Sequence, residues 1–133
     1  MNFASKFTIF IFDIENEEIA DIANVIAKYM FDIYDNDKEM KSFLEKLFEE
    51  YPVCAFSRLE DKSIISSLNR NQINFADDGY RFYDYIENGI LKTRKINKKA
   101  NWDNLLSIKI NGKVEYIYPA EYFKKLLLER MNK

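Results

Sequence analysis

The sequence has no histidine, one cysteine, three glycines and two prolines among its 133 residues. Without histidine, Ser-His and Cys-His nucleophilic arrangements are excluded, together with histidine-containing zinc sites and the zinc deaminase signature. The glycines Gly79, Gly89 and Gly112 are isolated, and none opens a phosphate-binding loop of the P-loop or dinucleotide type. Much common hydrolytic and nucleotide chemistry is therefore ruled out, and we expect neither a cofactor nor a bound metal.

Long apolar runs are also missing. No segment approaches the roughly 20 residues that a membrane-spanning helix needs, and the N-terminus has no basic region followed by an apolar stretch. The single Cys54 cannot form an internal disulfide, and its apolar neighbours in "PVCAF" indicate a small buried thiol. We expect a cytoplasmic protein without a membrane partner.

What the sequence does contain is a large share of apolar and aromatic residues. Apolar types make up 47% and aromatic types 16%, with eleven Phe and nine Tyr. A chain of this length and composition fits one compact globular domain, whose interior should hold many rings. We therefore expect a single domain over residues 1–133.

Charge is divided unevenly along the chain, although the net charge is only −2. Residues 1–61 carry 14 acidic and 6 basic side chains, whereas residues 62–133 carry 8 acidic and 14 basic ones. If the halves stay apart in the fold, the protein has one acidic and one basic surface, which would affect association with partners.

The N-terminal half predicts one strand and two helices. The continuous apolar run "KFTIFIF" at residues 6–12 favours a strand covered on both faces, in the centre of a sheet. Apolar residues then recur at helical spacing in residues 19–33, after an acidic start that suits a helix N-terminus. A second helix follows "YDND" and ends at Pro52. The inward faces of these helices are expected to include Ile22, Ile26, Phe43 and Leu47.

The middle of the chain gives weaker patterns. "PVCAFSR" reads as a short strand, and Asp61 or Ser63 could cap a helix that runs toward Phe75. The adjacent Asp77 and Asp78 indicate a turn. "YRFYDYIENG" then reads as a short helix that ends at Gly89, with an aromatic strand over 80–85 as the alternative.

The C-terminal pattern is clearer. "LLSIKI" and "KVEYIY" alternate in polarity and are joined by Asn111-Gly112, the dipeptide that favours a type I′ hairpin. Pro119 can then begin a closing helix that carries Phe123. The predicted fold class is α+β: a small single domain in which a central apolar strand and the C-terminal β-hairpin share a sheet covered by four to five helices.

Two acidic motifs resemble parts of known metal sites. "DNDKE" begins like a calcium loop, but Met40 stands where that loop needs glycine. Glu60 and Lys62 form an E-x-K arrangement that looks like half of a metal-dependent nuclease, with Asp35 or Asp37 as the carboxylate that would complete it. A charge cluster at a helix start explains Glu60 and Lys62 more simply.

The basic stretch "KTRKINKKANW" is the main candidate binding segment. Its cations could contact phosphates or an acidic protein surface, and Trp102 with nearby tyrosines could stack on unpaired bases. A solvated connector is the alternative. A second candidate contact is the aromatic stretch from residue 80, because Tyr, Arg and Phe are common in interfaces. The candidate binding residues are Lys92, Arg94, Lys95, Lys98, Lys99, Trp102, Tyr80, Arg81 and Tyr83.

The acidic cluster before the first helix could instead imitate a phosphate backbone, although acidic helix starts are common. It comprises Asp13, Glu15, Glu17, Glu18 and Asp21.

Several segments together resemble an uncharacterised family of small bacterial and mobile-element proteins. The resemblance rests on "FTIFIF", the helix pair, a strand followed by "EDKSIISSLN", and the final "YIYPAEYFKKLLLE". It implies a small accessory protein from a phage or plasmid, with no assigned activity. The matching positions in the middle segment are Lys62, Ser63, Ser67, Leu68 and Asn69.

These observations predict a non-enzymatic interaction protein. The expected role is that of a phage or mobile-element accessory factor that binds and modulates a host complex for defence or nucleic-acid processing, for example as an inhibitor. A protein partner is expected first, nucleic acid could bind through residues 92–99, and a homodimer is compatible with the sequence. The alternative is a metal-dependent nuclease or toxin that uses Glu60, Lys62 and one of Asp35 or Asp37.

Overall fold

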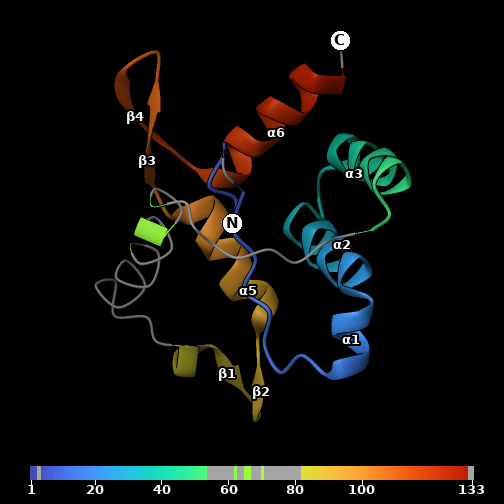
Figure 1. Cartoon of the computed structure of the whole chain (residues 1–133). Helices are drawn as coiled ribbons and strands as arrows, with labels where there is room; N and C mark the ends of the chain where they lie inside the picture. Colours follow the sequence, from blue (N-terminus) through green and yellow to red (C-terminus); the bar gives the residue numbers. More distant parts are fainter. Residues whose placement is uncertain (3, 54–61, 63–64, 67–69, 71–81, 132–133) are drawn as a thin grey trace.

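The structure is a computed structural model that describes residues 1–2, 4–53, 62, 65–66, 70 and 82–131 (Figure 1). Its N-terminal segment runs along a central helix, α5, and is followed by three helices, α1 to α3. Two β-hairpins and a closing helix, α6, follow in the later part of the chain. The helices are α1 (Asn16–Ala20), α2 (Ile22–Ile33), α3 (Lys38–Glu50), α5 (Thr93–Lys98), the π-helix η2 (Lys99–Asp103) and α6 (Pro119–Met131).

Both helices predicted in the N-terminal half are present. The first is interrupted at Asp21, which separates α1 from α2. The second, α3, begins at Asp37, whose side chain accepts a hydrogen bond from the backbone N–H of Met40 at 3.0 Å. Such an N-cap satisfies one of the amides that a helix start leaves unpaired. The end of α3 at Glu50 precedes Pro52, as expected.

The prediction of a central strand in a sheet was wrong for residues 6–12. No described strand pairs with this segment, which instead lies along α5 (Figure 1). The Asn101 side chain accepts from Thr8 N at 2.9 Å and donates to Thr8 O at 2.7 Å. The Asn97 side chain does the same for Phe10, at 2.7 and 3.0 Å. Two asparagine amides therefore replace a neighbouring strand.

The spacing of these residues explains why the arrangement fits. Residues two apart along an extended chain are separated by about 6.6 Å, and residues four apart along a helix rise by about 6 Å. The spacing between Asn97 and Asn101 along the helix therefore equals the spacing between Phe10 and Thr8 along the extended segment, so each asparagine lies beside its partner. The second amide proton of each asparagine goes to a helix carbonyl, Thr93 O at 2.9 Å and Asn97 O at 2.7 Å. Each buried amide group thus uses both of its N–H donors and accepts one hydrogen bond.

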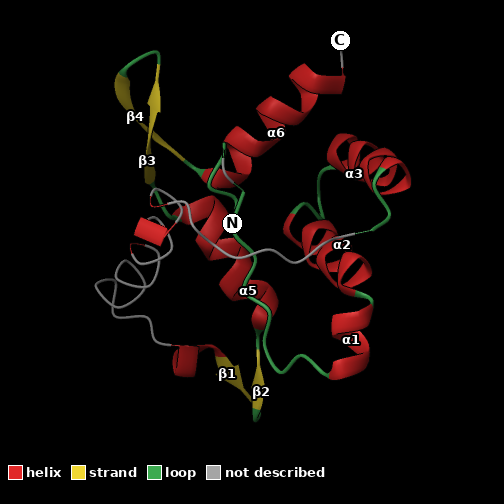
Figure 2. Ribbon diagram, in the orientation of Figure 1, coloured by secondary structure: helices red, strands yellow, loops and turns green. Residues whose placement is uncertain are grey.

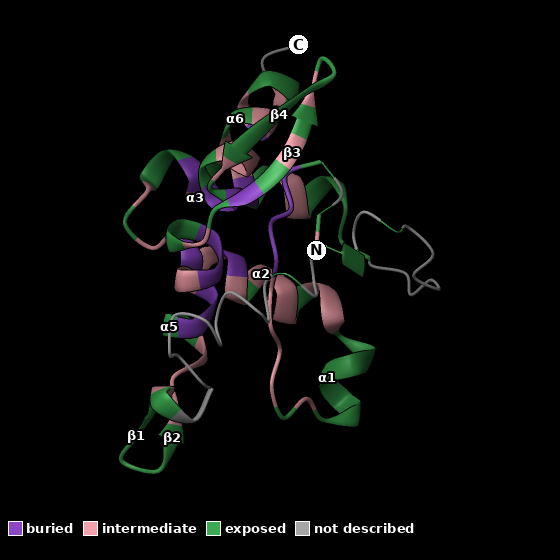
Figure 3. Cartoon of the chain, turned by 90° about the vertical axis from the view of Figure 1, so that its left-hand side faces the viewer, coloured by how far each residue is buried: buried purple, intermediate pink, exposed green. Residues whose placement is uncertain are grey.

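The main core lies between α2, α3, α6 and the N-terminal segment (Figure 3). Tyr34 is its polar member, and its hydroxyl donates to Ala120 O at 2.6 Å. The predicted inward residues Ile26, Phe43, Leu47 and Phe123 pack against this core as half-buried side chains. The buried members are Phe7, Met30, Ile33, Tyr34, Met40, Leu44, Ala120 and Leu127.

A second cluster lies beneath α5. Ile96 and Ala100 are completely buried there, and Phe10, Phe12, Tyr85 and Leu91 pack against them. Since Phe7 belongs to the main core and Phe10 to this one, the N-terminal segment joins the two clusters.

Two antiparallel hairpins are present (Figure 2). The predicted C-terminal one consists of β3 (Leu106–Ile110) and β4 (Lys113–Ile117). Its turn residues Asn111 and Gly112 both have positive φ, 52° and 80°, as a type I′ turn requires. The α+β class is confirmed. Within the described residues, however, this hairpin forms its own two-stranded sheet and shares none with the N-terminal segment.

The other hairpin corrects a sequence prediction. The short helix expected to end at Gly89 is a 3-10 turn, η1 (Phe82–Tyr85), followed by β1 (Ile86–Glu87) and β2 (Ile90–Leu91). Asn88 and Gly89 form its turn, with φ of 52° and 76°. The alternative of an aromatic strand is also wrong over Phe82–Tyr85.

Several predictions fall outside the described residues. They concern Cys54 and most of the strand "PVCAFSR", most of the helix from Asp61 or Ser63, and the Asp77-Asp78 turn. In the part of the chain that the structure does describe, no helix is both long and apolar enough to cross a membrane.

Candidate functional site

The basic stretch is a helix that contributes to the core and not a connecting loop. Contact of its cations with a partner stays a prediction. Ile96, Asn97, Ala100 and Asn101 are buried on the inner side of α5 and η2. Their one-, three- and four-residue spacings follow a helix face. Two of the four are asparagines, and this made the stretch look uniformly polar in the sequence.

The cations of α5 form ion pairs with two acids. Arg94 and Lys98, one helical turn apart, both contact Asp35, and the Lys98 Nζ to Asp35 Oδ1 distance is 2.9 Å. Lys95 contacts Glu87 of the first hairpin. The hydrogen bond from Lys98, followed by the charges of Lys98 and Arg94, lowers the pKa of Asp35. We name this surface the α5 face, formed by Lys92, Arg94, Lys95, Lys98, Lys99 and Trp102 with Asp35 and Glu87.

The α5 face presents exposed cations. Among the described residues, Arg94, Lys95 and Lys98 form ion pairs with Asp35 and Glu87, and Lys99 makes a further interaction of its own. The side chains of Arg94 and Lys95 are 51% and 58% exposed despite their ion pairs. The hydrogen bond from Lys95 lowers the pKa of Glu87, so both acids are ionised at neutral pH. Because the side chains of Arg94 and Lys95 stay exposed in their ion pairs, a partner can make a second contact with them.

Trp102 is anchored along one edge. Its indole Nε1 donates to Ile33 O at 3.0 Å, and its ring meets Tyr34 edge-on with centroids 5.6 Å apart. The residue remains 36% exposed. It lines a cleft of about 260 Å³ together with Lys98 and residues 33–37. The indole is thus a fixed aromatic wall beside the charged groups of the α5 face.

The other candidate carboxylate, Asp37, is paired with α6. Lys124 Nζ lies 2.6 Å from Asp37 Oδ2 and 3.5 Å from Glu39 Oε1. Burial opposes ionisation of Asp37, but the hydrogen bonds from Lys124 and from the Met40 amide outweigh it and lower the pKa. The hydrogen bond to Asp37 raises the pKa of Lys124 in turn.

The nuclease arrangement stays a prediction. Glu60 lies outside the described residues, and Lys62 is an exposed helical residue. Asp35 and Asp37 are present, but cationic side chains already occupy their carboxylate oxygens. Within the described residues, no group of three or more carboxylate, histidine or cysteine side chains could hold a metal ion.

The remaining candidates are placed only in part. Tyr80 and Arg81 lie outside the described residues, and Tyr83 is located only by its backbone in η1, so this predicted contact stays a prediction. The acidic cluster is exposed around α1, where Glu15 and Glu18 form a capping box. That geometry accords with the interpretation of the cluster as a helix start.

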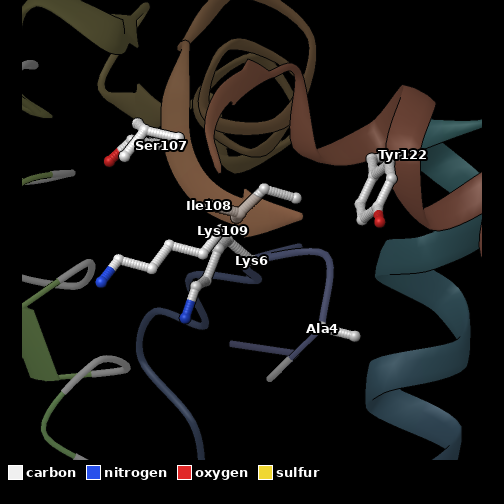
Figure 4. Close-up of a pocket in the computed structure, with 7 residues that line it drawn as sticks. Ala4, Lys6, Ser107, Ile108, Lys109 and Tyr122 are labelled. Atoms are coloured by element: carbon white, nitrogen blue, oxygen red, sulfur yellow. The ribbon is translucent and has the colours of Figure 1, made fainter. Parts of the chain in front are cut away.

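Sequence reasoning missed a second cavity, of about 630 Å³ and with a mixed polar and apolar lining, beside the β3–β4 hairpin (Figure 4). Lys6 and Lys109 extend in the same direction there, and Tyr122 stands on the opposite side (Figure 4). Lys6 is only 5% exposed and has a positive φ of 60°. It also makes a further interaction of its own, so the cavity does not present two available cations. The alternation of the hairpin strands could have located Lys109 but not Lys6.

Among known protein families, a family model described as "Domain of unknown function (DUF6933)" matches residues 1–122. No curated protein matches the chain, and no solved structure does.

Proposed function

Because the chain belongs to the DUF6933 family, a domain of unknown function, its role must be inferred from its own surface, and we propose a non-enzymatic interaction protein. Its binding surface is the α5 face, and its partner is a protein that presents carboxylates to Arg94 and Lys95. The family match agrees with the resemblance to an uncharacterised family. As part of the proposal, the partner is a component of a host defence or nucleic-acid-processing complex, and the chain inhibits it as a mobile-element accessory factor.

The observation that carries this proposal is the exposure of two cationic side chains, Arg94 and Lys95, on a rigid helix. Arg94 has five N–H donors, and its contact with Asp35 is through Nη2. The remaining donors can receive a carboxylate from a partner. Burial of Ile96 and Asn97 on the inner side fixes α5, so little ordering is needed when a partner binds.

The mixed signs of the α5 face favour a protein over nucleic acid. Asp35 and Glu87 lie among the cations, where they would repel a phosphate backbone. A protein can place a basic side chain opposite these acids and acidic side chains opposite Arg94 and Lys95, which gives complementary potentials. Trp102, which is 36% exposed, adds a residue type that often dominates protein interfaces.

The test is affinity capture from the source cell with three forms of the immobilised chain. The test variant is R94Q/K95Q, which removes two charges from the α5 face. The control is K28Q/K38Q, which removes two exposed charges from α2 and α3. Each lysate is divided, and one half is treated with nuclease before capture. Captured material is compared by mass spectrometry and by nucleic-acid staining.

We expect a defined protein that the wild type and K28Q/K38Q retain, that R94Q/K95Q loses, and that nuclease does not release. The retained protein should have an acidic surface and should bind again as a purified component. If R94Q/K95Q retains this protein as well as the wild type does, the α5 face is not the binding surface. Release by nuclease would show that nucleic acid is the partner instead.

A further inference from the structure

The β4 strand of the C-terminal hairpin has an open outer edge. Residues 113–116 are all exposed, with Val114 at 56% and Tyr116 at 72%. β3 occupies the inner edge, and no described strand pairs with the outer one. The hairpin also projects away from α2 and α3 (Figure 1). An exposed edge with apolar side chains is a template for pairing with another strand.

Backbone geometry shows which groups are available. Ile110 and Lys113 flank a two-residue turn, and such flanking residues exchange hydrogen bonds. Because this direction alternates along a strand, Val114 and Tyr116 turn their N–H and C=O groups toward the outer edge. A two-stranded hairpin alone is marginally stable in water, so a further strand would stabilise it.

We propose that β4 pairs with β4 of a second copy of this chain, antiparallel about a two-fold axis at Val114. The two hairpins then form a continuous four-stranded sheet. In this register Val114 faces its own equivalent, and Lys113 of each copy faces Glu115 of the other. Opposite charges directly across an antiparallel pair stabilise it, and the two-fold axis creates the Lys113–Glu115 pair twice.

Neighbouring symmetric registers are worse. An axis at Glu115 places the two Glu115 carboxylates face to face, which is destabilising. An axis at Tyr116 places Lys113 opposite Pro119, which has no N–H and where the chain leaves the strand for α6. The charges of Lys113 and Glu115 and the direction of the chain after β4 therefore favour the register with the two-fold axis at Val114. This edge and the α5 face belong to different elements, so the inference does not depend on the proposed function.

The test is the molar mass of the purified full-length chain by sedimentation equilibrium. Short edge pairings make weak interfaces, so concentrations from about 5 to 300 µM are needed. The variants K113E and E115K each create like-charge pairs, and K113E/E115K restores opposite charges in the reverse order. K109E on β3 is the control, because it makes the same charge change on the same hairpin away from the pairing edge. Far-UV circular dichroism confirms that each variant folds.

The wild type and K109E should approach twice the 15.9 kDa chain mass as the concentration rises. K113E and E115K should associate at least about tenfold more weakly, and K113E/E115K should recover the wild-type dissociation constant. A wild type that stays monomeric throughout the range overturns the proposal. So does a single charge reversal that leaves association unchanged, or a double variant that does not recover.

Discussion

At the scale of single residues, two asparagines determine how the N-terminal segment is held. Asn97 and Asn101 supply both hydrogen-bonding groups that a neighbouring strand would offer to Phe10 and Thr8. The apolar run at residues 6–12 correctly predicted burial of part of the segment, but it predicted the wrong partner. The pattern of apolar residues predicts which residues are buried. It does not predict whether a neighbouring strand or the side chains of a helix form hydrogen bonds with the buried backbone.

Replacement of Asn101 by Leu should therefore be costly. The variant removes the two hydrogen bonds that the Asn101 side chain makes with the buried backbone of Thr8, at about 0.5–1.5 kcal/mol each. We expect the free energy of unfolding to fall by roughly 1–3 kcal/mol in chemical denaturation. Hydrogen exchange of the Thr8 amide should also accelerate. The exposed Asn36 replaced by Ala is the control, and equal stability of N101L and wild type would refute this role of Asn101.

Asp37 should make stability depend on pH. Its pKa is lowered in the fold, so its contribution is present above the unfolded value of about 3.9 and is lost as the pH falls through the folded pKa. The pKa of Lys124 is raised, so that contribution is lost when the pH rises through its folded pKa. The variant D37N keeps the helix cap but removes the ion pair.

At pH 7, D37N should be less stable than the wild type by up to about 1 kcal/mol. The difference should shrink below about pH 4 and again above about pH 10.4, the unfolded pKa of lysine. Thermal unfolding across this range provides the measurement. A difference that does not vary with pH would mean that the ion pair with Lys124 adds nothing to stability.

At the scale of elements, helices and the C-terminal hairpin were predictable because their signals are local. The signals are the apolar residues at helical spacing in α3, its N-cap Asp37 and the Asn111-Gly112 turn. Each depends only on residues that are close together in the sequence. The first hairpin was missed although Asn88-Gly89 is the same dipeptide. Its strands have only two residues each, so they show no alternation that could outweigh the aromatic helix-like pattern before them.

The two turn glycines should respond to substitution through backbone conformation alone. Gly89 and Gly112 have φ of 76° and 80°, and a Cβ at either position would meet no atom within 4 Å. Alanine at each should cost about 1–2 kcal/mol, because the left-handed conformation is unfavourable for L-residues. Asparagine, which tolerates this conformation, should cost less. Equal unfolding free energies for the Ala and Asn variants would contradict this explanation.

At the scale of the whole molecule, the two oppositely charged halves of the chain meet. Asp35 and Asp37 from the acidic half pair with Arg94, Lys98 and Lys124 from the basic half. The composition predicted the imbalance, but not that these groups would neutralise one another in part. The sequence also singled out Asp35 and Asp37 for one hypothesis and Arg94, Lys98 and Trp102 for another. Only the fold brings them to one surface.

The most direct measurement is the association rate of the purified captured partner with the chain at low and high salt. If Arg94 and Lys95 guide binding, R94Q/K95Q should associate about tenfold more slowly than K28Q/K38Q at low salt, with a weaker salt dependence. The two variants should converge as salt screens the charges. Equal rates for R94Q/K95Q, K28Q/K38Q and the wild type at low salt would show that the α5 face is not the binding surface.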